Sequence, residues 1–273
     1  RPQPANHMGT MLHRYKPISS SVNFLAIQPM ATLLLLSHCI LPYLAATIPE
    51  EHTATWTVTE VTGQAFVKER PDQATPLPLQ VGSHLPPDGK ILLIAAKESL
   101  LEITQSEGNF LRLGRATLAE FSTSKIRLLQ GSFLRNTKKE TLFALSGKKV
   151  DAGIRLKGTL MAESTGNGGL KVVLVAGKAD IGTDADGAKP LRPGQLIFVH
   201  SSPAKLGDLY DLDLPLLLST SRLVSGFKKP LPNLASMRTS MLIQGLNTKR
   251  RYEALVGDAP DDEKVQMWAI KEK

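Results

Sequence analysis

The chain is almost free of cysteine. Cys39 is the single cysteine among 273 residues, and it lies in an apolar run. A disulfide within the chain needs two cysteines and a cysteine metal site needs several, so both are excluded. A domain without disulfides must be stabilised by burial of its core. The 42% hydrophobic content and the length of the chain allow this.

Aromatic side chains are also scarce, at 5% of the chain. Few rings are then available for stacking on sugars or unpaired bases, which argues against carbohydrate and single-strand nucleic-acid binding. The net charge of +8 is spread along the chain, so we expect no nucleic-acid partner. We interpret the basic clusters as solvated loops and a helix end, with contact to an anionic polymer as the alternative. These clusters are Lys138-Lys139, Lys148-Lys149 and Lys249-Arg250-Arg251.

No motif of a catalytic or metal site occurs in the sequence. After residue 46 the histidines are His52, His84 and His200, and no two have the spacing of metal ligands. Ser164 lacks the leading glycine of a nucleophile elbow, and the glycines at 166–169 lack the Lys-Ser/Thr that follows in a phosphate-binding loop. We therefore predict no catalytic, cofactor-binding or metal-binding residues. We expect a protein that is not an enzyme, with an enzyme of unrecognised type as the alternative.

Two acidic pairs are the remaining candidates for chemistry. Asp184 and Asp186, beside Gly187, resemble the start of a calcium loop, but no acid follows at the closing position, so we interpret them as a hairpin tip. Asp211 and Asp213 have the i, i+2 spacing of a carboxylate pair for glycoside chemistry, but no aromatic sugar platform is nearby.

Residues 1–46 have the pattern of a signal peptide. With Met11 as the start, His13, Arg14 and Lys16 form a basic region, an apolar run follows at 31–41, and cleavage is expected near Ala46. We therefore expect an exported protein, periplasmic or extracellular.

Two other interpretations of this segment stay open. The run could remain as an inner-membrane anchor, although it is short for a span of about 20 residues. Contact with a membrane is expected only through this segment, and only if it is uncleaved. Cys39 could instead carry a lipid, but His38 stands where a lipobox has a small residue.

A β-rich domain is predicted at 57–203, after a short linker at 47–56. Residues 57–62, 111–113 and 125–128 alternate polar and apolar side chains, whereas 171–175 is continuously apolar after Lys171, as in a strand buried on both faces. Glycine-rich turns separate these runs. The pattern is typical of an all-β fold, an antiparallel β-sandwich or roll of many short strands.

The remainder is expected to be a partly helical extension at 204–257 and a charged flexible tail at 258–273. Pro230 and Pro232 break any helix before Asn233, which is a candidate cap for a helix that ends near Gly245. We expect the face that carries Leu234, Met237 and Met241 to pack on the β-domain, with docking of a partner as the alternative.

Segments between residues 57 and 200 resemble, in order, the FecR domain family. The resemblance is carried by an opening strand, an L-x-x-G-x-x-L turn, a segment close to the family's G-x-x-G-T element and a closing l-x-x-G-q. These are Gly63–Val67, Leu79–Leu85, Gly153–Leu160 and Leu191–Gln195, with similar pieces at 99–103, 108–114, 126–133 and 172–179.

This resemblance implies a non-catalytic binding or scaffold module of the bacterial cell envelope, whose partner is another envelope protein or an anionic polymer. Regulatory FecR proteins are membrane-tethered regulators of sigma-factor activity, and that role is the alternative. They carry a cytoplasmic segment before the membrane span, and the stretch between Met11 and the apolar run is too short for one.

Gly158-Thr159 is the part of the chain that most closely resembles the family. A glycine that interrupts a strand marks a bulge or a close approach of two backbones. We expect 155–160 and 172–175 to form an antiparallel hairpin through the turn at 166–169.

Overall fold

The computed structural model describes residues 55–86, 90–105, 109–231, 234–247, 253–258 and 265–271. The chain divides into two compact units, Arg1–Glu50 and Glu51–Lys273. The expectations for residues 1–46 and for His52 lie outside the described residues. Within the described ranges, none of the helices has the length and apolar character that a membrane span requires.

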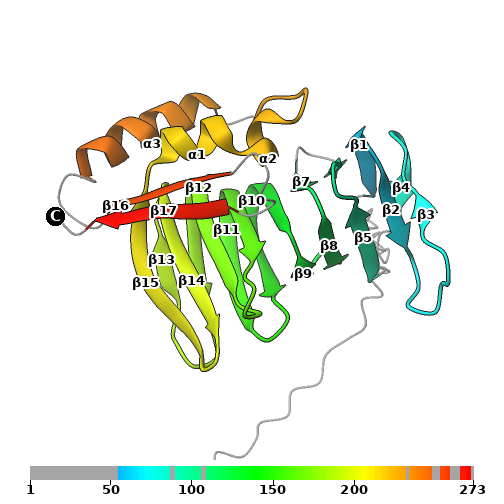
Figure 1. The fold of residues 1–273 in the computed structure, drawn as a ribbon, viewed down its shortest axis with the longest axis horizontal. Helices are drawn as coiled ribbons and strands as arrows, with labels where there is room; N and C mark the ends of the chain where they lie inside the picture. The colour runs from blue at the N-terminus through cyan, green and yellow to red at the C-terminus, as the bar shows by residue number, and fades with distance from the viewer. Residues whose placement is uncertain are drawn as a thin grey trace, which may run out of the picture. The chain divides into compact units, whose positions relative to one another are not determined.

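The second unit is built mainly from strands, as predicted, with helices near its C-terminus (Figure 1). The strands are β1 Trp56–Thr62, β2 Ala65–Lys68, β3 Leu77–Pro78, β4 His84–Leu85, β5 Ile91–Ala95, β6 Leu100–Thr104, β7 Phe110–Leu113, β8 Thr117–Phe121, β9 Lys125–Gln130, β10 Ser132–Ser146, β11 Asp151–Ser164, β12 Leu170–Gly182, β13 Lys189–Leu191, β14 Gln195–Ser201, β15 Ala204–Leu212, β16 Glu253–Asp258 and β17 Val265–Lys271. The helices are α1 Leu214–Thr220, α2 Arg222–Ser225 and α3 Leu234–Asn247.

The sheet folds over into two layers because long strands run through both. β10, β11 and β12 pair with one another in antiparallel ladders. The first half of β10 pairs with β7 and its second half with β9, while β12 pairs first with β14 and then with β13. We call the layer with β1, β6, β7, β14 and β15 the helix-side layer. The layer with β2, β5, β8, β9 and β13 is the far layer.

The crease between the layers passes through two facing glycines. Gly158 of β11 lies opposite Gly177 of β12, with φ values of +133° and +92°. Register shifts accompany this pair, between Thr137 and Thr141 of β10 and after Thr159 of β11. Such irregularities bend a strand sharply. β11 and β12 form the predicted antiparallel hairpin, which contains the bend of the sheet, but the register differs from the expectation: residues 155–159 pair with 176–180, and 172–174 pair with 160–162.

Two apolar cores lie on the two faces of the helix-side layer. The larger core fills the space between the layers, where Trp56 of β1 meets Phe121 of β8 edge to face at 4.9 Å. The smaller core lies on the other face and includes Leu214, Leu217 and Leu223 of the helices. Residues 171–175 are buried throughout because Val172 and Leu174 face the first core while Val173 and Val175 face the second. The prediction of a strand buried on both faces is confirmed.

The predicted boundaries need correction. β1 begins at Trp56, which is buried rather than part of a linker. β15 continues the sheet past the expected boundary at 203, because it pairs with β14. The expected flexible tail at 258–273 contains β17, which pairs with β16, and β16 extends the ladder from β15. Strand formation there depends on the edge that β15 offers, which the local sequence does not reveal.

The helices cover the outer face of the helix-side layer. Asp213 caps α1, its carboxylate accepting a hydrogen bond from the backbone nitrogen of Leu216 at 2.9 Å. α3 confirms the predicted C-terminal helix, with Met237 fully buried and Met241 half-buried against the second core. Its predicted cap, Asn233, and the side chain of Leu234 lie outside the described residues.

Candidate functional site

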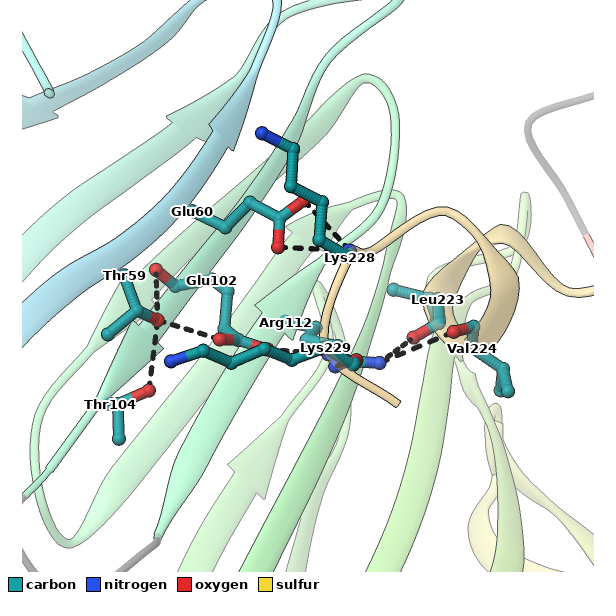
Figure 2. A network of polar contacts seen from close by, with 9 residues as sticks. All are labelled: Thr59, Glu60, Glu102, Thr104, Arg112, Leu223, Val224, Lys228 and Lys229. Atoms are coloured by element: carbon teal, nitrogen blue, oxygen red, sulfur yellow. Dashed lines mark hydrogen bonds and ion pairs between the residues drawn. The ribbon is translucent and has the colours of Figure 1, made fainter. Parts of the chain in front are cut away.

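A buried ion pair fastens the segment 222–231, which we call the strap, to the helix-side layer. Arg112 of β7 lies opposite Glu102 of β6, with its Nε 2.8 Å from the carboxylate oxygen Oε2. Arg112 also donates hydrogen bonds to strap carbonyl oxygens, those of Leu223, Val224 and Lys229 (Figure 2). The two charged side chains are 1% and 5% exposed, so water does not compete for these bonds.

Other groups around this ion pair also contact the strap. The Arg112 guanidinium lies 4.4 Å from the ring centroid of Phe227. Both carboxylate oxygens of Glu60 accept a hydrogen bond from the backbone nitrogen of Lys228, each at 3.1 Å (Figure 2). Thr59 donates to Glu102 at 2.7 Å. Because donors from the fold occupy these carboxylates, the cluster is an attachment point, with a structural rather than a chemical role.

A second buried ion pair lies on the same face. Glu163 of β11 and Lys171 of β12 are cross-strand neighbours, with nitrogen and oxygen 2.6 Å apart and side chains 5% and 9% exposed. The space beside them, toward Leu217 and Leu223 of the helices, measures about 10 Å³. That volume accommodates about one water molecule. It is too small for an organic ligand.

The acidic pairs singled out in the sequence hold loops together. Asp186 accepts a hydrogen bond from the backbone nitrogen of Leu206, which ties the hairpin tip to β15. Asp211 accepts from the side-chain amide of Gln195 at 3.3 Å, whereas Asp213 caps α1. Asp211 and Asp213 therefore have separate hydrogen-bond partners, and the structure does not unite them as a carboxylate pair.

A hollow lies where the helix-side layer ends beside the turn between β11 and β12. It measures about 480 Å³ and is lined by Thr165, Gly166, Asn167, Leu170, Phe198, Val199, His200 and Tyr210. We call it the aromatic pocket. The ring of Phe198 is stacked near His200 at 6.3 Å and meets Tyr210 edge to face at 6.1 Å. Three half-buried rings therefore meet in a chain that has few aromatic residues.

Polar atoms of the aromatic pocket are free to meet a ligand. The side-chain oxygen of Asn167 accepts hydrogen bonds from Thr165 at 2.5 Å and from the backbone nitrogen of Gly169 at 3.2 Å. Those bonds fix the turn and leave the amide nitrogen of Asn167 without a partner among the described residues. No described residue hydrogen-bonds the His200 ring or the Tyr210 hydroxyl. The pocket thus joins a ring-lined wall to several unused hydrogen-bonding groups.

The histidines have different surroundings. His84 is exposed in β4 and shares a hydrogen bond of 3.2 Å with the hydroxyl of Thr57. His200 lies in β14, and Gly207 of the neighbouring strand leaves room for its ring, because a Cβ on Gly207 would come within 2.9 Å of His200 Nε2. The described part of the chain contains no cluster of three or more histidine, cysteine, aspartate or glutamate residues suited to a metal ion.

The sequence did not indicate the aromatic pocket or the strap. The alternation at 111–113 correctly predicted that Arg112 points away from the first core. The helical segment covers that face of the sheet, so Arg112 is buried. For the aromatic pocket, the signal present was Phe198 and His200 at i, i+2 in one strand with Tyr210 in the next. Their meeting depends on the pairing of β14 with β15, which the local pattern does not specify.

Comparisons with known proteins give one structural likeness. No family model matches the chain, and no curated protein sequence matches it. Two crystal structures of a putative anti-sigma factor from Parabacteroides distasonis are similar to it at 13% sequence identity, with a TM-score of 0.35 in each case. Each match covers 42% of this chain and 57% of the crystallised chain, so the likeness spans little more than half of those proteins.

Proposed function

We propose that the chain is a non-catalytic, FecR-like binding module of the bacterial cell envelope. The observation that carries the proposal is the aromatic pocket. Its volume of about 480 Å³ lies in the usual range for small-molecule sites. Rings with a few convergent polar groups are the usual lining of such sites. The ligand expected there is a small ring compound with hydrogen-bonding substituents, packed on Phe198 and Tyr210.

The FecR-like part of the proposal rests on motif positions. Six glycines of the resembling segments have positive φ, a conformation in which glycine is strongly favoured over other residues. They are Gly63, Gly82, Gly131, Gly158, Gly177 and Gly194. The motif spacing therefore coincides with the turns and the crease of this fold.

Ligand-detected NMR with the full chain tests the binding function. The probes are single compounds from a panel of cell-wall sugars and small aromatic acids. We expect saturation transfer from the protein to at least one ring compound, lost in Tyr210→Leu. Tyr210→Phe, which removes only the hydroxyl, should weaken the binding by about tenfold. Binding that survives Tyr210→Leu, or no binding across the panel, would reject the aromatic pocket as the site.

Export is a separate proposal with its own test. The segment with basic residues before an apolar run and Ala46 supports removal of the N-terminus during secretion. Mass spectrometry of envelope fractions should find a mature peptide that begins near Thr47. An intact Met11 terminus in the inner membrane would instead favour the tethered regulator of sigma-factor activity.

A further inference from the structure

The far layer carries an apolar row on its solvent face. On that layer, one face of each strand packs on the core and the other is expected to be polar. Phe66 of β2 pairs with Pro78 and Ile94, and Ile94 pairs with Leu118 of β8, so that four apolar side chains cross the sheet side by side. Phe66, Ile94 and Leu118 are half-buried and Pro78 is exposed. A contiguous outward row of this kind indicates an interaction surface.

Cations border this apolar row. The next row across the same strands pairs Lys68 with Leu92, Leu92 with Glu120, and Glu120 with Arg127. A cleft of about 180 Å³ lies along it and is lined by Lys68, Arg70, Pro71, Lys90, Ile91, Leu92, Glu120 and Leu129. We call the apolar row and this cleft together the basic-apolar face.

The charges of the basic-apolar face do not cancel. Glu120 lies 2.9 Å from Lys90 and 3.6 Å from Arg127, so this one carboxylate is shared by two cations. Arg70 is paired only loosely, 4.0 Å from Asp72, with both side chains largely exposed. Lys68 forms no ion pair with any described residue. The surplus charge of this face is positive, and it lies directly beside the apolar side chains.

We propose that the basic-apolar face docks an acidic amphipathic segment of a partner protein. Carboxylates of the partner meet Lys68, Arg70 and Lys90, while its apolar side chains cover Phe66, Ile94 and Leu118. An anionic polymer would satisfy the cations but leave the apolar row exposed to water, so the two rows together favour a polypeptide. The proposal deepens the binding function, although it rests on different residues from the aromatic pocket.

Titration of a labelled peptide with the full chain tests the docking. The probe is a synthetic amphipathic peptide with leucines on one face and glutamates on the other, followed by fluorescence anisotropy. We expect saturable binding that weakens as salt is raised. Lys68→Glu with Arg70→Glu should weaken it by about tenfold or more, and so should Ile94→Thr.

Matched variants distinguish docking at this face from a general effect of the net charge of the protein. Lys157→Glu with Lys178→Glu makes the same change of net charge at exposed positions of β11 and β12, and should alter the affinity by less than about twofold. Tyr210→Leu should bind the peptide normally, which separates this proposal from the aromatic pocket. Circular dichroism and the thermal midpoint of each variant establish that it is folded.

Three results would overturn the proposal. The first is an absence of saturable binding, and the second is equal affinity for polyglutamate or polyphosphate. The third is a peptide affinity that changes neither in Lys68→Glu with Arg70→Glu nor in Ile94→Thr. Equal affinity for the polymers would assign the face to charge alone.

Discussion

At the scale of single residues, the glycine pair of the crease is the most demanding feature of the chain. A Cβ on Gly158 would collide with the carbonyl oxygen of Ala176 and with the Cα of Gly177, and one on Gly177 would collide with Lys157. Each contact involves backbone, which cannot swing aside as a side chain can. The positive φ of both residues adds strain for any other amino acid.

Gly158→Val should therefore destabilise the domain by roughly 2 kcal/mol or more. Gly153→Val is the matched control, since Gly153 lies in the same strand with nothing within 4 Å of a built Cβ. Urea midpoints of the two variants check the prediction. Near-wild-type stability of Gly158→Val would show that the crease tolerates a side chain.

Arg135 is a buried charge that only a few contacts stabilise. Its guanidinium lies 4.2 Å from the ring centroid of Phe143 and donates to the carbonyl oxygen of Thr123 at 3.3 Å. Among the described residues nothing accepts a hydrogen bond from its Nη1. Burial lowers the pKa of Arg135 from its ordinary value to about 10.

This lowered pKa means that the folded state holds the proton less tightly than the unfolded state. Below pH 10 both states are charged, so the desolvation cost to folding is constant. Above about pH 10 the folded state loses the proton before the unfolded state does, so the contribution of Arg135 to stability rises with pH. At neutral pH the cost of the charge is about 3 kcal/mol on this basis.

Arg135→Met should accordingly raise the free energy of unfolding at neutral pH by about 1–3 kcal/mol, because it removes the charge and keeps the volume. Arg155→Met, at a largely exposed arginine of β11, should change little. Urea unfolding at pH 7 measures both. A less stable Arg135→Met protein would mean that Phe143 and Thr123 compensate the charge fully.

At the scale of elements, attachment of the strap depends on Arg112. The residue resembles Arg135 in burial but differs in its partners, which are Glu102 and three strap carbonyl oxygens. Removing one member of a satisfied buried pair leaves the other charge without compensation.

Arg112→Met should therefore lower the free energy of unfolding by roughly 3–5 kcal/mol, opposite in sign to Arg135→Met. Protease cleavage within the strap should also become faster, and a strap cleavage rate that is unchanged would show that other contacts hold the segment. Arg155→Met again serves as the control.

The strands were predictable from the sequence, but their surroundings were not. Alternation and glycine turns located β1, β7, β9 and β12 and gave the all-β class. They could not indicate that a helical strap covers Arg112, because alternation distinguishes the two faces of a strand without identifying what packs on each. The parallel pairing of β16 with β15 is similarly non-local, which is why the tail was expected to be flexible.

At the scale of the whole molecule, the strands and helices of the unit Glu51–Lys273 share the second apolar core. The sequence predicted a β-domain over residues 57–203, followed by a partly helical extension. The second core joins these two parts. Leu134, Met161, Val173, Val175 and Leu196 all lie beneath elements that follow residue 203.

A chain that ends at Pro203 should therefore fail to form a cooperative domain. Burial of one such side chain contributes about 1.5–3 kcal/mol, and exposing these five removes an amount comparable to the usual total stability of about 5–15 kcal/mol. The truncation also removes the strap from Arg112 and the strand partner of β14. We expect a broad thermal transition and binding of a hydrophobic dye, whereas residues 51–273 should unfold in one sharp transition. A sharp transition with native near-ultraviolet circular dichroism in the shorter chain would show that the far layer and the first core suffice for folding, and that the helices are an appendage on a self-sufficient β-domain.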